Sequence, residues 1–279
     1  MAGVGFKAVS DDLKRLVVEQ LRESRKYRTV SLATMERIAE WAVTRSGSPK
    51  EIVKNAKRKL HQVYGAYLDP STLKRAEELV GKLHTGMDME EVRSVCREIL
   101  SCHASTRERL PILDVALNAL REALGPFSSV SDLACGLNPF CLPWLDPSGE
   151  IRYLASDIDD RLVAVINRFL ECMGRSATAA SHDILCGNPP AAEVVLLFKV
   201  LPSLERQEKG AGEKIILRLA KERAVRKLVV SFPSHSLGGH GKGMEAHYGG
   251  FIESIAGQLG LSFQRFPYST EIFYILAIR

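Results

Sequence analysis

Apolar residues recur at helical spacing through the first third of the chain. Three stripes show this spacing: Leu13, Leu16, Val17 and Leu21; Ile38, Trp41 and Ala42; and Ile52, Val53, Ala56, Leu60 and Val63. Ser48 followed by Pro49 is typical of a helix N-cap and first helical residue, and Asp69 with Pro70 repeats that signal. No run here alternates as a half-buried strand does. The pattern predicts an all-helical domain over residues 1–105.

From about residue 106 the pattern changes to short apolar runs separated by helical stretches. After a helix from Leu113 to Leu124, the runs are 130–134, 151–156, 177–181, 194–198, 227–232, 261–266 and 273–278. Strands that alternate with helices form a mostly parallel sheet covered on both faces. Residues 267–271 are too few for a crossover helix, so the last strand runs antiparallel. This seven-stranded layout predicts an α/β fold, a Rossmann-like class I methyltransferase domain over residues 106–279.

Positive charge is concentrated in the helical third. The chain carries 38 Lys and Arg against 33 Asp and Glu, and residues 1–105, with 19 against 14, hold the whole excess of +5. The clustered cations are Arg22, Arg25, Lys26 and Arg28, followed by Lys50, Lys54, Lys57, Arg58 and Lys59. A charged helix face is usually only solvated. A face this one-sided also fits a phosphate-binding footprint that recognises folded RNA by its backbone.

Composition argues against several classes of protein. No apolar run approaches the roughly 18 residues of a membrane span, and the start of the chain lacks the layout of a signal peptide. The six cysteines are scattered, with no CxxC pair and no zinc-like spacing, which argues against disulfides and a structural metal. We expect a cytoplasmic protein with reduced thiols, no metal and no membrane partner, and we treat it as a monomer.

Three consecutive predicted strands are each followed by residues suited to a nucleoside. The first runs into Gly136, where a small residue lets a ligand approach the backbone. The second ends at Asp157, whose carboxylate can accept both hydroxyls of a ribose; a helix cap is the alternative, although Asp159 is better placed for that. The third ends at Asp183, which can accept from an adenine amine. Together these residues favour S-adenosylmethionine as the cofactor.

The end of the fourth predicted strand narrows the acceptor chemistry. Lys199 stands where enzymes that methylate exocyclic amines carry an Asn/Asp-Pro-Pro-aromatic motif, and no Pro-Cys nucleophile for pyrimidine C5 occurs. After an apolar strand, Lys199 either extends to solvent or faces an anion. Guanine N7 needs no proton removed, so positioning alone can promote its attack on a sulfonium methyl group. Asp157, Asp183 and Glu205 could favour the positive charge that moves onto the base.

A glycine-rich basic segment, residues 231–244, follows the fifth predicted strand. It departs from the P-loop pattern, because Ser236 and Gly243 stand where that pattern has glycine and Ser or Thr. The segment predicts either a surface turn or a basic loop through Lys242 that contacts a nucleic-acid backbone.

Five blocks of sequence, spread over nearly the whole chain, carry a family resemblance. They are Leu60-His61-x-x-Tyr64-Gly65-Ala66-Tyr67, His103-Ala104-Ser105-Thr106-Arg107-Glu108-Arg109, Asp132-x-Ala134-Cys135-Gly136-Leu137-Asn138-Pro139, Lys199-x-Leu201-Pro202-x-Leu204-Glu205, and Ser231-Phe232-Pro233 with Ser236-Leu237-Gly238 and Lys242-Gly243-Met244. In this order they resemble the aminoglycoside-resistance methyltransferases that modify N7 of a decoding-site guanine in 16S rRNA.

The resemblance implies roles for individual residues. Arg109 would hold the methionine carboxylate of the cofactor, Asp157 its ribose, and Asp183 with Ile184 its adenine. The other residues implied around the cofactor are Tyr67, His103, Ala104, Ser105, Ala134, Phe198 and Gln207. Lys199, Glu205 and the loop through Lys242 would face the target base or its neighbours. The implied substrate is the assembled 30S subunit, which suits a separate basic docking domain.

We therefore interpret the chain as a guanine-N7 methyltransferase of 16S rRNA that confers resistance to 4,6-disubstituted deoxystreptamines. The predicted RNA contacts are Arg22, Arg25, Lys26, Lys50, Lys54, Lys57, Arg58 and Lys242. One alternative is methylation of a neighbouring adenine at N1, against which the Lys199 motif argues. Two further alternatives are a non-catalytic RNA-docking protein that binds the cofactor, and a small-molecule methyltransferase, which the basic N-terminal third disfavours.

Overall fold

The computed structural model describes residues 2–45, 47–65, 69–234 and 244–278. Helical elements come first: α1 (Ala2–Arg22), α2 (Leu32–Val43), α3 (Pro49–Leu60), the π-helical turn η1 (His61–Gly65), α4 (Pro70–Val80), α5 (Met89–Ser101), α6 (Ala104–Arg107), the 3-10 turn η2 (Leu110–Ile112) and α7 (Leu113–Leu124). Strands and helices then alternate: β1 (Ser129–Leu133), the 3-10 turn η3 (Asn138–Cys141), α8 (Leu142–Leu145), β2 (Arg152–Asp157), α9 (Asp160–Cys172), β3 (Ala177–Ser181), β4 (Val194–Phe198), α10 (Leu201–Gln207), α11 (Ala211–Lys221), β5 (Lys227–Pro233), α12 (Met244–Leu259), β6 (Ser262–Pro267) and β7 (Glu271–Ala277).

The local signals in the sequence correspond to real helix ends. Ser48 and Glu51 form a reciprocal capping box at the start of α3, and Asp69 and Asp159 cap α4 and α9 through their side chains. Within the described ranges, no helix combines the length and apolar character needed to cross a membrane.

In the described part of the chain, seven strands form one sheet in the order β3-β2-β1-β4-β5-β7-β6. Strands β1 to β5 pair in parallel, and β7 lies antiparallel between β5 and β6. The predicted mostly parallel sheet with a reversed last strand is therefore confirmed. The strand order reverses between β1 and β4, and ligands of open α/β sheets bind at such a point, outside the carboxyl ends of the strands.

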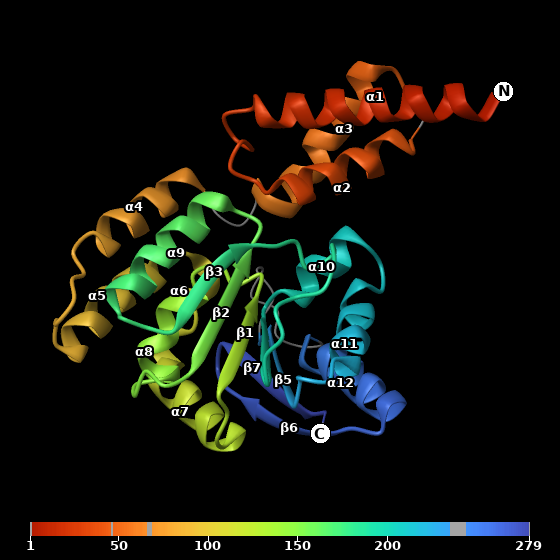
Figure 1. The fold of residues 1–279 in the computed structure, drawn as a ribbon. Helices are drawn as coiled ribbons and strands as arrows, with labels where there is room; N and C mark the ends of the chain where they lie inside the picture. Colours follow the sequence, from red (N-terminus) through yellow and green to blue (C-terminus); the bar gives the residue numbers. More distant parts are fainter. Residues whose placement is uncertain (1, 46, 66–68, 235–243, 279) are drawn as a thin grey trace.

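Helices bury both faces of the sheet, as the continuous apolar runs predict. Alternate residues of β4 point to opposite sides: Val194 and Leu196 join a core shared with α4, α5, α7 and α9, whereas Val195 and Leu197 join one shared with α10, α11 and α12. The two groups of helices lie on opposite sides of the sheet (Figure 1).

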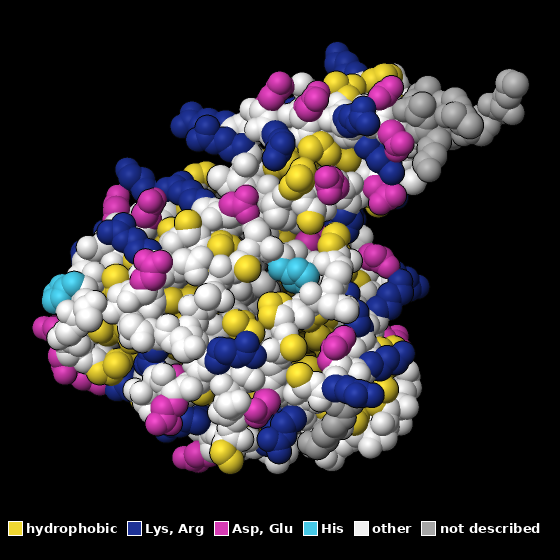
Figure 2. Space-filling view, in the orientation of Figure 1, with side chains coloured by type: hydrophobic (Ala, Val, Ile, Leu, Met, Phe, Trp, Pro, Cys, Tyr) yellow, Lys and Arg dark blue, Asp and Glu magenta, His cyan; other side chains and the backbone are white. Residues whose placement is uncertain are grey.

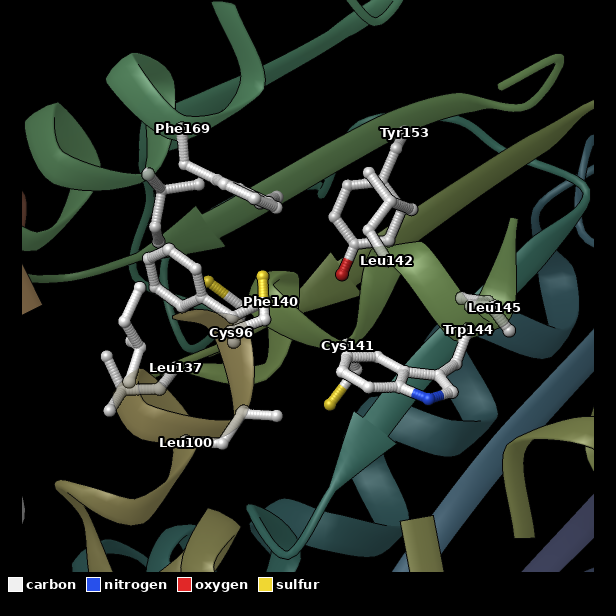
Figure 3. Packing of buried hydrophobic residues seen from close by; sticks show 14 of the residues in the cluster. Cys96, Leu100, Leu137, Phe140, Cys141, Leu142, Trp144, Leu145, Tyr153 and Phe169 are labelled. Carbon is white, nitrogen blue, oxygen red and sulfur yellow. The ribbon is translucent and has the colours of Figure 1, made fainter. Parts of the chain in front are cut away.

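Small and aromatic side chains fill the first of these cores. The rings of Phe140 and Phe169 pack with centroids 4.8 Å apart, and Cys96 lies beside Phe140 (Figure 3). Cys135 and Cys141 are buried packing residues, as predicted, and all six cysteines are free thiols.

Helices α1, α2 and α3 pack around a core of their own, and we call them the three-helix unit. Leu21, Ile38 and Leu60 are fully buried in it. Helices α4 and α5 instead bury residues such as Leu79 and Leu100 in the core that includes the sheet. The three-helix unit projects from the rest of the molecule, whereas α4 and α5 lie beside α9 (Figure 1). We therefore propose a domain boundary near η1, whereas the change from helices to strands comes later, between α7 and β1.

Polar contacts join the three-helix unit to the carboxyl ends of β2 and β3. The Ser31 N–H donates to the Ile158 carbonyl at 2.7 Å, and the Asp160 N–H donates to the Thr29 carbonyl at 2.8 Å. The Tyr64 hydroxyl, from η1, donates to the Asp159 carboxylate at 2.6 Å. Burial and this carboxylate raise the pKa of Tyr64, so the phenol stays protonated and remains a donor.

Candidate active site

A cavity of about 540 Å³ lies at the carboxyl ends of β1 to β4, with α6, α10 and the three-helix unit contributing to its walls. Small-molecule sites span roughly 300–1,000 Å³, so this volume suits a nucleoside-sized ligand. Every described residue that the sequence assigns to the cofactor lines it: His103, Ala104, Ser105, Arg109, Ala134, Gly136, Asp157, Asp183, Ile184, Phe198 and Gln207. Tyr67 and Lys242 lie outside the described residues. The fold thus brings residues that are far apart in the sequence together around one cavity.

The backbone is unusual where β1 and β4 end. Ala134 and Lys199 have φ values of +50° and +55°, and among the described non-glycine residues only these two have positive φ. Left-handed backbone is uncommon for residues with a Cβ, and it concentrates at functional sites. Both residues line the cavity at the point where the strand order reverses. Gly136 follows with φ +53°, and a Cβ added there would meet nothing within 4 Å, so the space beside it is open.

Asp157 presents its carboxylate to this opening. Oδ2 accepts the Gly136 N–H at 2.9 Å, and Oδ1 accepts the Ile158 N–H at 2.7 Å. These bonds fix the carboxylate, and burial raises its pKa to about 6. Asp159, rather than Asp157, caps α9, as the sequence indicates. Asp157 is therefore not needed as a helix cap and remains available to a ligand.

Arg109 is fully buried and anchored from β7. Its guanidinium makes a bidentate ion pair with Glu271, at 2.9 Å and 2.7 Å, and its Nη1 donates to Asn138 Oδ1 at 2.6 Å and to Cys141 Sγ at 3.8 Å. The charge of Arg109 holds the pKa of Glu271 low despite burial. A guanidinium has five N–H donors, and these four bonds leave one for a ligand in the cavity that Arg109 lines.

The anchor continues below the cavity floor. Asn138 Nδ2 donates to Asp132 Oδ2 at 2.7 Å, and the Tyr153 hydroxyl donates to the same oxygen. Burial raises the pKa of Asp132 to about 6. Asn138 therefore connects two buried carboxylates, Asp132 through its amide and Glu271 through Arg109. Such a connected polar network fixes side-chain positions when its members are hydrogen-bonded.

Lys199 faces anions rather than solvent. Its Nζ lies 2.9 Å from Glu108 Oε2, 2.9 Å from the Ser105 carbonyl and 3.5 Å from Glu271 Oε2, and its side chain is only 8% exposed. The ammonium thus links the end of β4 to the segment that holds Arg109. It lines the cavity but is already engaged by the protein.

Glu205 is not among the residues that line the cavity, and its predicted role beside the target base stays a prediction. Its carboxylate accepts the N–H groups of Gly210 and Gly212 at 2.9 Å and 2.8 Å, at the start of α11. The first N–H groups of a helix have no partner within the helix, and a carboxylate there also interacts favourably with the helix dipole. The need of α11 for a capping carboxylate explains why the Glu205 side chain points toward that helix.

The predicted RNA contacts lie at the surface of the three-helix unit. Arg22, Arg25, Lys26, Lys50, Lys54 and Arg58 are exposed, and Lys57 is half-buried. Figure 2 shows cationic side chains over this unit, with acidic ones among them. Lys59 differs from its neighbours, because it is buried and donates to the Gln207 carbonyl at 2.7 Å. Of the predicted α3 contacts, Lys50, Lys54 and Arg58 are therefore exposed and Lys57 is half-buried.

Sequence reasoning missed three residues that organise the site. Glu271 and Asn138 orient Arg109, and Arg37 of α2 lines the cavity. Asn138 stands within a block that carries the resemblance, so its position was a usable signal. Glu271 and Arg37 have partners 162 and 146 positions away, and no local pattern indicates such pairs.

Comparison with known proteins places the chain in a family. A family model described as ribosomal RNA methyltransferase (FmrO) matches residues 23–275. A 16S rRNA (guanine(1405)-N(7))-methyltransferase from Micromonospora echinospora is 36% identical over 93% of this chain and 95% of its own length. One of the same name from Serratia marcescens is 36% identical over 91% and 94%. The structure of 16S rRNA methyltransferase RmtF in complex with S-adenosyl-L-homocysteine matches with a TM-score of 0.80, at 33% identity over 95% of this chain and 97% of that one. This chain belongs to the FmrO family of ribosomal RNA methyltransferases.

Proposed function

We propose that this chain transfers a methyl group from S-adenosylmethionine to N7 of a decoding-site guanine of 16S rRNA. The observation that carries the proposal is the cavity at the strand ends, lined by all the described residues expected to hold the cofactor. Relatives that carry this activity in their names match over more than nine-tenths of the chain. The structure of RmtF with S-adenosyl-L-homocysteine supports the same cofactor here.

The chemistry of the cavity fits S-adenosylmethionine, which supplies a sulfonium methyl group when it is bound. Asp157 offers a fixed carboxylate to the ribose hydroxyls beside the open space at Gly136. Arg109 keeps one N–H for the methionine carboxylate, and Phe198, whose ring centre lies 4.8 Å from the guanidinium carbon, covers it. Asp183 and Ile184 line the cavity where the adenine would lie. Anchored donors and acceptors of this kind hold a ligand with little reorganisation.

The acceptor chemistry needs positioning more than proton transfer. Guanine N7 attacks through a lone pair and carries no proton, so the enzyme does not need to supply a general base. Holding the two reactants in line provides most of the acceleration in such a reaction. Lys199, fixed by Glu108 and the Ser105 carbonyl, keeps the 103–109 segment against the end of β4 and so preserves that alignment.

We propose that the exposed cations of the three-helix unit hold the enzyme on the assembled 30S subunit. Phosphate contacts supply most of the sequence-independent affinity for nucleic acid. An enzyme that acts on ribosomal subunits would work in the cytoplasm, and the cavity, built within one chain, would allow it to act as a monomer. Methylation at the drug-binding guanine would confer resistance to 4,6-disubstituted deoxystreptamines such as kanamycin and gentamicin.

Methylation of purified 30S subunits with labelled cofactor tests the reaction. We expect label in 16S rRNA and strand cleavage at the decoding-site guanine after borohydride and aniline, which cleave at N7-methylguanine. Label at the neighbouring adenine would instead support the N1 reaction. Binding of cofactor and 30S without any label would support a non-catalytic docking protein, and either result would overturn the proposal.

Calorimetry tests the cofactor site directly. We expect Arg109→Ala and Asp157→Ala each to weaken binding of S-adenosylhomocysteine at least tenfold, because each removes a charge-assisted contact. Asp160→Ala, at an exposed residue outside the cavity lining, is the matched control and should bind as the unchanged protein does. Unchanged affinity in both cavity variants would remove the proposed site.

A further inference from the structure

Helix α2 of the three-helix unit holds the carboxylate of Asp183. Thr34 Oγ1 donates to Asp183 Oδ2 at 2.9 Å, and Arg37 approaches the same oxygen with Nε at 2.9 Å and Nη2 at 2.8 Å. Thr34 and Arg37 are three positions apart, so they lie on one face of the helix. Asp183 is 3% exposed, and its partners on α2 lie about half the chain away in sequence.

This arrangement divides the two oxygens of Asp183 between structure and ligand. Oδ2 is saturated by the donors of α2, whereas Oδ1 accepts only the Leu185 N–H, at 2.9 Å, in the described part of the chain. A carboxylate oxygen has two lone pairs. One therefore remains on Oδ1 for an outside donor, such as the exocyclic amine of adenine, while the other end of the carboxylate is held still.

The same helix also reaches Gln207, another residue that lines the cavity and that the resemblance implies around the cofactor. Arg37 Nη2 donates to Gln207 Oε1 at 3.2 Å. Lys59 of α3 donates to the Gln207 carbonyl at 2.7 Å, which satisfies an unpaired carbonyl at the end of α10. The guanidinium of Arg37, with a side chain 22% exposed, is itself part of the cavity wall.

We propose that Arg37 is a positioning residue of the cofactor site, and that α2 is part of that site as well as of the RNA-docking unit. This inference rests on the proposed role of Asp183 at the adenine. Arg37 fixes the carboxylate that accepts the adenine amine and orients Gln207 beside it. Loss of Arg37 leaves Asp183 buried with fewer donors, so its carboxylate reorients toward the remaining ones and no longer presents Oδ1 to the ligand.

The test is calorimetric titration of S-adenosylhomocysteine into the full-length chain. We expect Arg37→Ala to weaken binding about tenfold, the loss that follows removal of one charge-assisted positioning contact. Arg37→Lys keeps the charge but not the fork, and should recover part of that loss. Arg45→Ala is the matched control, because Arg45 belongs to the same unit but stacks on Trp41 outside the cavity lining, and it should bind normally.

A double variant separates positioning from a general loss of structure. Asp183→Asn alone should weaken binding, and Arg37→Ala added to it should weaken binding much less than Arg37→Ala does alone, because the contact at Asp183 is already gone and only that with Gln207 remains to be lost. Additive losses would overturn the proposal. In steady-state methylation, KM for S-adenosylmethionine should rise in Arg37→Ala with little change in kcat, as expected when binding is lost equally before and during the reaction.

The failures are distinguishable. If Asp183→Asn binds normally, the proposed adenine site itself is wrong. If Asp183→Asn loses affinity but Arg37→Ala keeps it, only the positioning role fails. If Arg37→Ala binds S-adenosylhomocysteine normally but loses affinity for 30S subunits, Arg37 belongs to the RNA surface and the inference is overturned.

Discussion

The exposed cations of α3 and the buried Arg109 below the cavity occupy opposite physical environments. On α3, the side chains of Lys50, Lys54 and Arg58 are exposed. Below the cavity, Arg109 is 2% exposed and bonded to a carboxylate that is fully buried. The same residue types therefore serve different purposes. The exposed cations of α3 remain available to phosphate, whereas Arg109 is committed to the carboxylate of Glu271.

The difference shows how one chain can bind a polyanion and still position a small ligand. A buried unpaired cation would be strongly destabilising, so Arg109 requires Glu271. An exposed cation has no such requirement, because water solvates it. RNA affinity can therefore vary with surface charge on α3, while the cofactor site is held by buried pairs that such changes do not reach.

Removal of the buried carboxylate should have the largest effect. Glu271→Ala leaves Arg109 buried without its main partner, and we expect the free energy of unfolding to fall by about 3–5 kcal/mol, measured by urea denaturation. Glu77→Ala breaks the exposed pair with Arg161, whose side chains are 49% and 37% exposed, and should cost less than about 1 kcal/mol. Equal losses would show that burial does not distinguish the two kinds of cation.

Charge reversal on α3 should weaken RNA binding and leave the cofactor site unchanged. We expect Lys54→Glu with Arg58→Glu to weaken 30S binding by tenfold to about a hundredfold at low salt, and the difference to narrow as salt is raised. Affinity for S-adenosylhomocysteine should not change. Lys209→Glu with Lys221→Glu changes the net charge equally on exposed residues of the sheet domain and is the control. A comparable loss of 30S binding in the control would mean that net charge, not the α3 face, drives docking.

How much the sequence predicts follows from the range of the interactions. The strands, the reversed β7 and the caps at Ser48, Asp69 and Asp159 depend on nearest neighbours and on periodicity, so they are readable locally. The placement of Asp157 and Asp183 at strand ends follows from the same pattern, because parallel strands align their carboxyl ends.

Other features depend on contacts that only the folded chain creates. The Arg109–Glu271 pair joins residues 162 positions apart, and Lys59 is buried although it sits within a run of exposed cations. Glu205 stands in a block that carries the resemblance, but its carboxylate caps α11, because the loop between α10 and α11 brings the N–H groups of Gly210 and Gly212 to it. Such choices depend on the local need for a hydrogen-bond partner, which a linear pattern does not reveal.

The pH dependence of cofactor binding should test the role of the buried Asp157 carboxylate in the cavity. Burial raises the pKa of Asp157 from near 4 to about 6, so its carboxylate is ionised above pH 6 and protonated below it. Ribose hydroxyls need the ionised form as acceptor, so affinity for S-adenosylhomocysteine should fall about tenfold per pH unit below 6. Asp157→Asn should bind more weakly at pH 7.5 and lose most of this dependence.

Asp132 has the same raised pKa and provides the internal control for that profile. Asp132 is present in the unchanged chain and in Asp157→Asn, so only the difference between their two pH profiles of cofactor affinity reports on Asp157. A variant profile as steep as that of the unchanged chain would assign the dependence to another group.

The smallest expected effect, loss of the α3 cap, tests whether the three-helix unit and the sheet domain unfold as separate cooperative units. Ser48 accepts the Glu51 N–H and Glu51 accepts the Ser48 N–H at the start of α3. Loss of such a cap in Ser48→Ala should destabilise the three-helix unit by about 1 kcal/mol, which corresponds to roughly fivefold faster hydrogen exchange of α3 amides. Amides of β1 and β4 should exchange at unchanged rates. Affinity for S-adenosylhomocysteine should stay within about twofold, because the cap lies at the opposite end of α3 from the contact of Lys59 with Gln207. Equal acceleration in α3 and in the strands would instead mean that the exposed and buried cations belong to one cooperative structure, so that RNA docking and cofactor positioning could not vary independently.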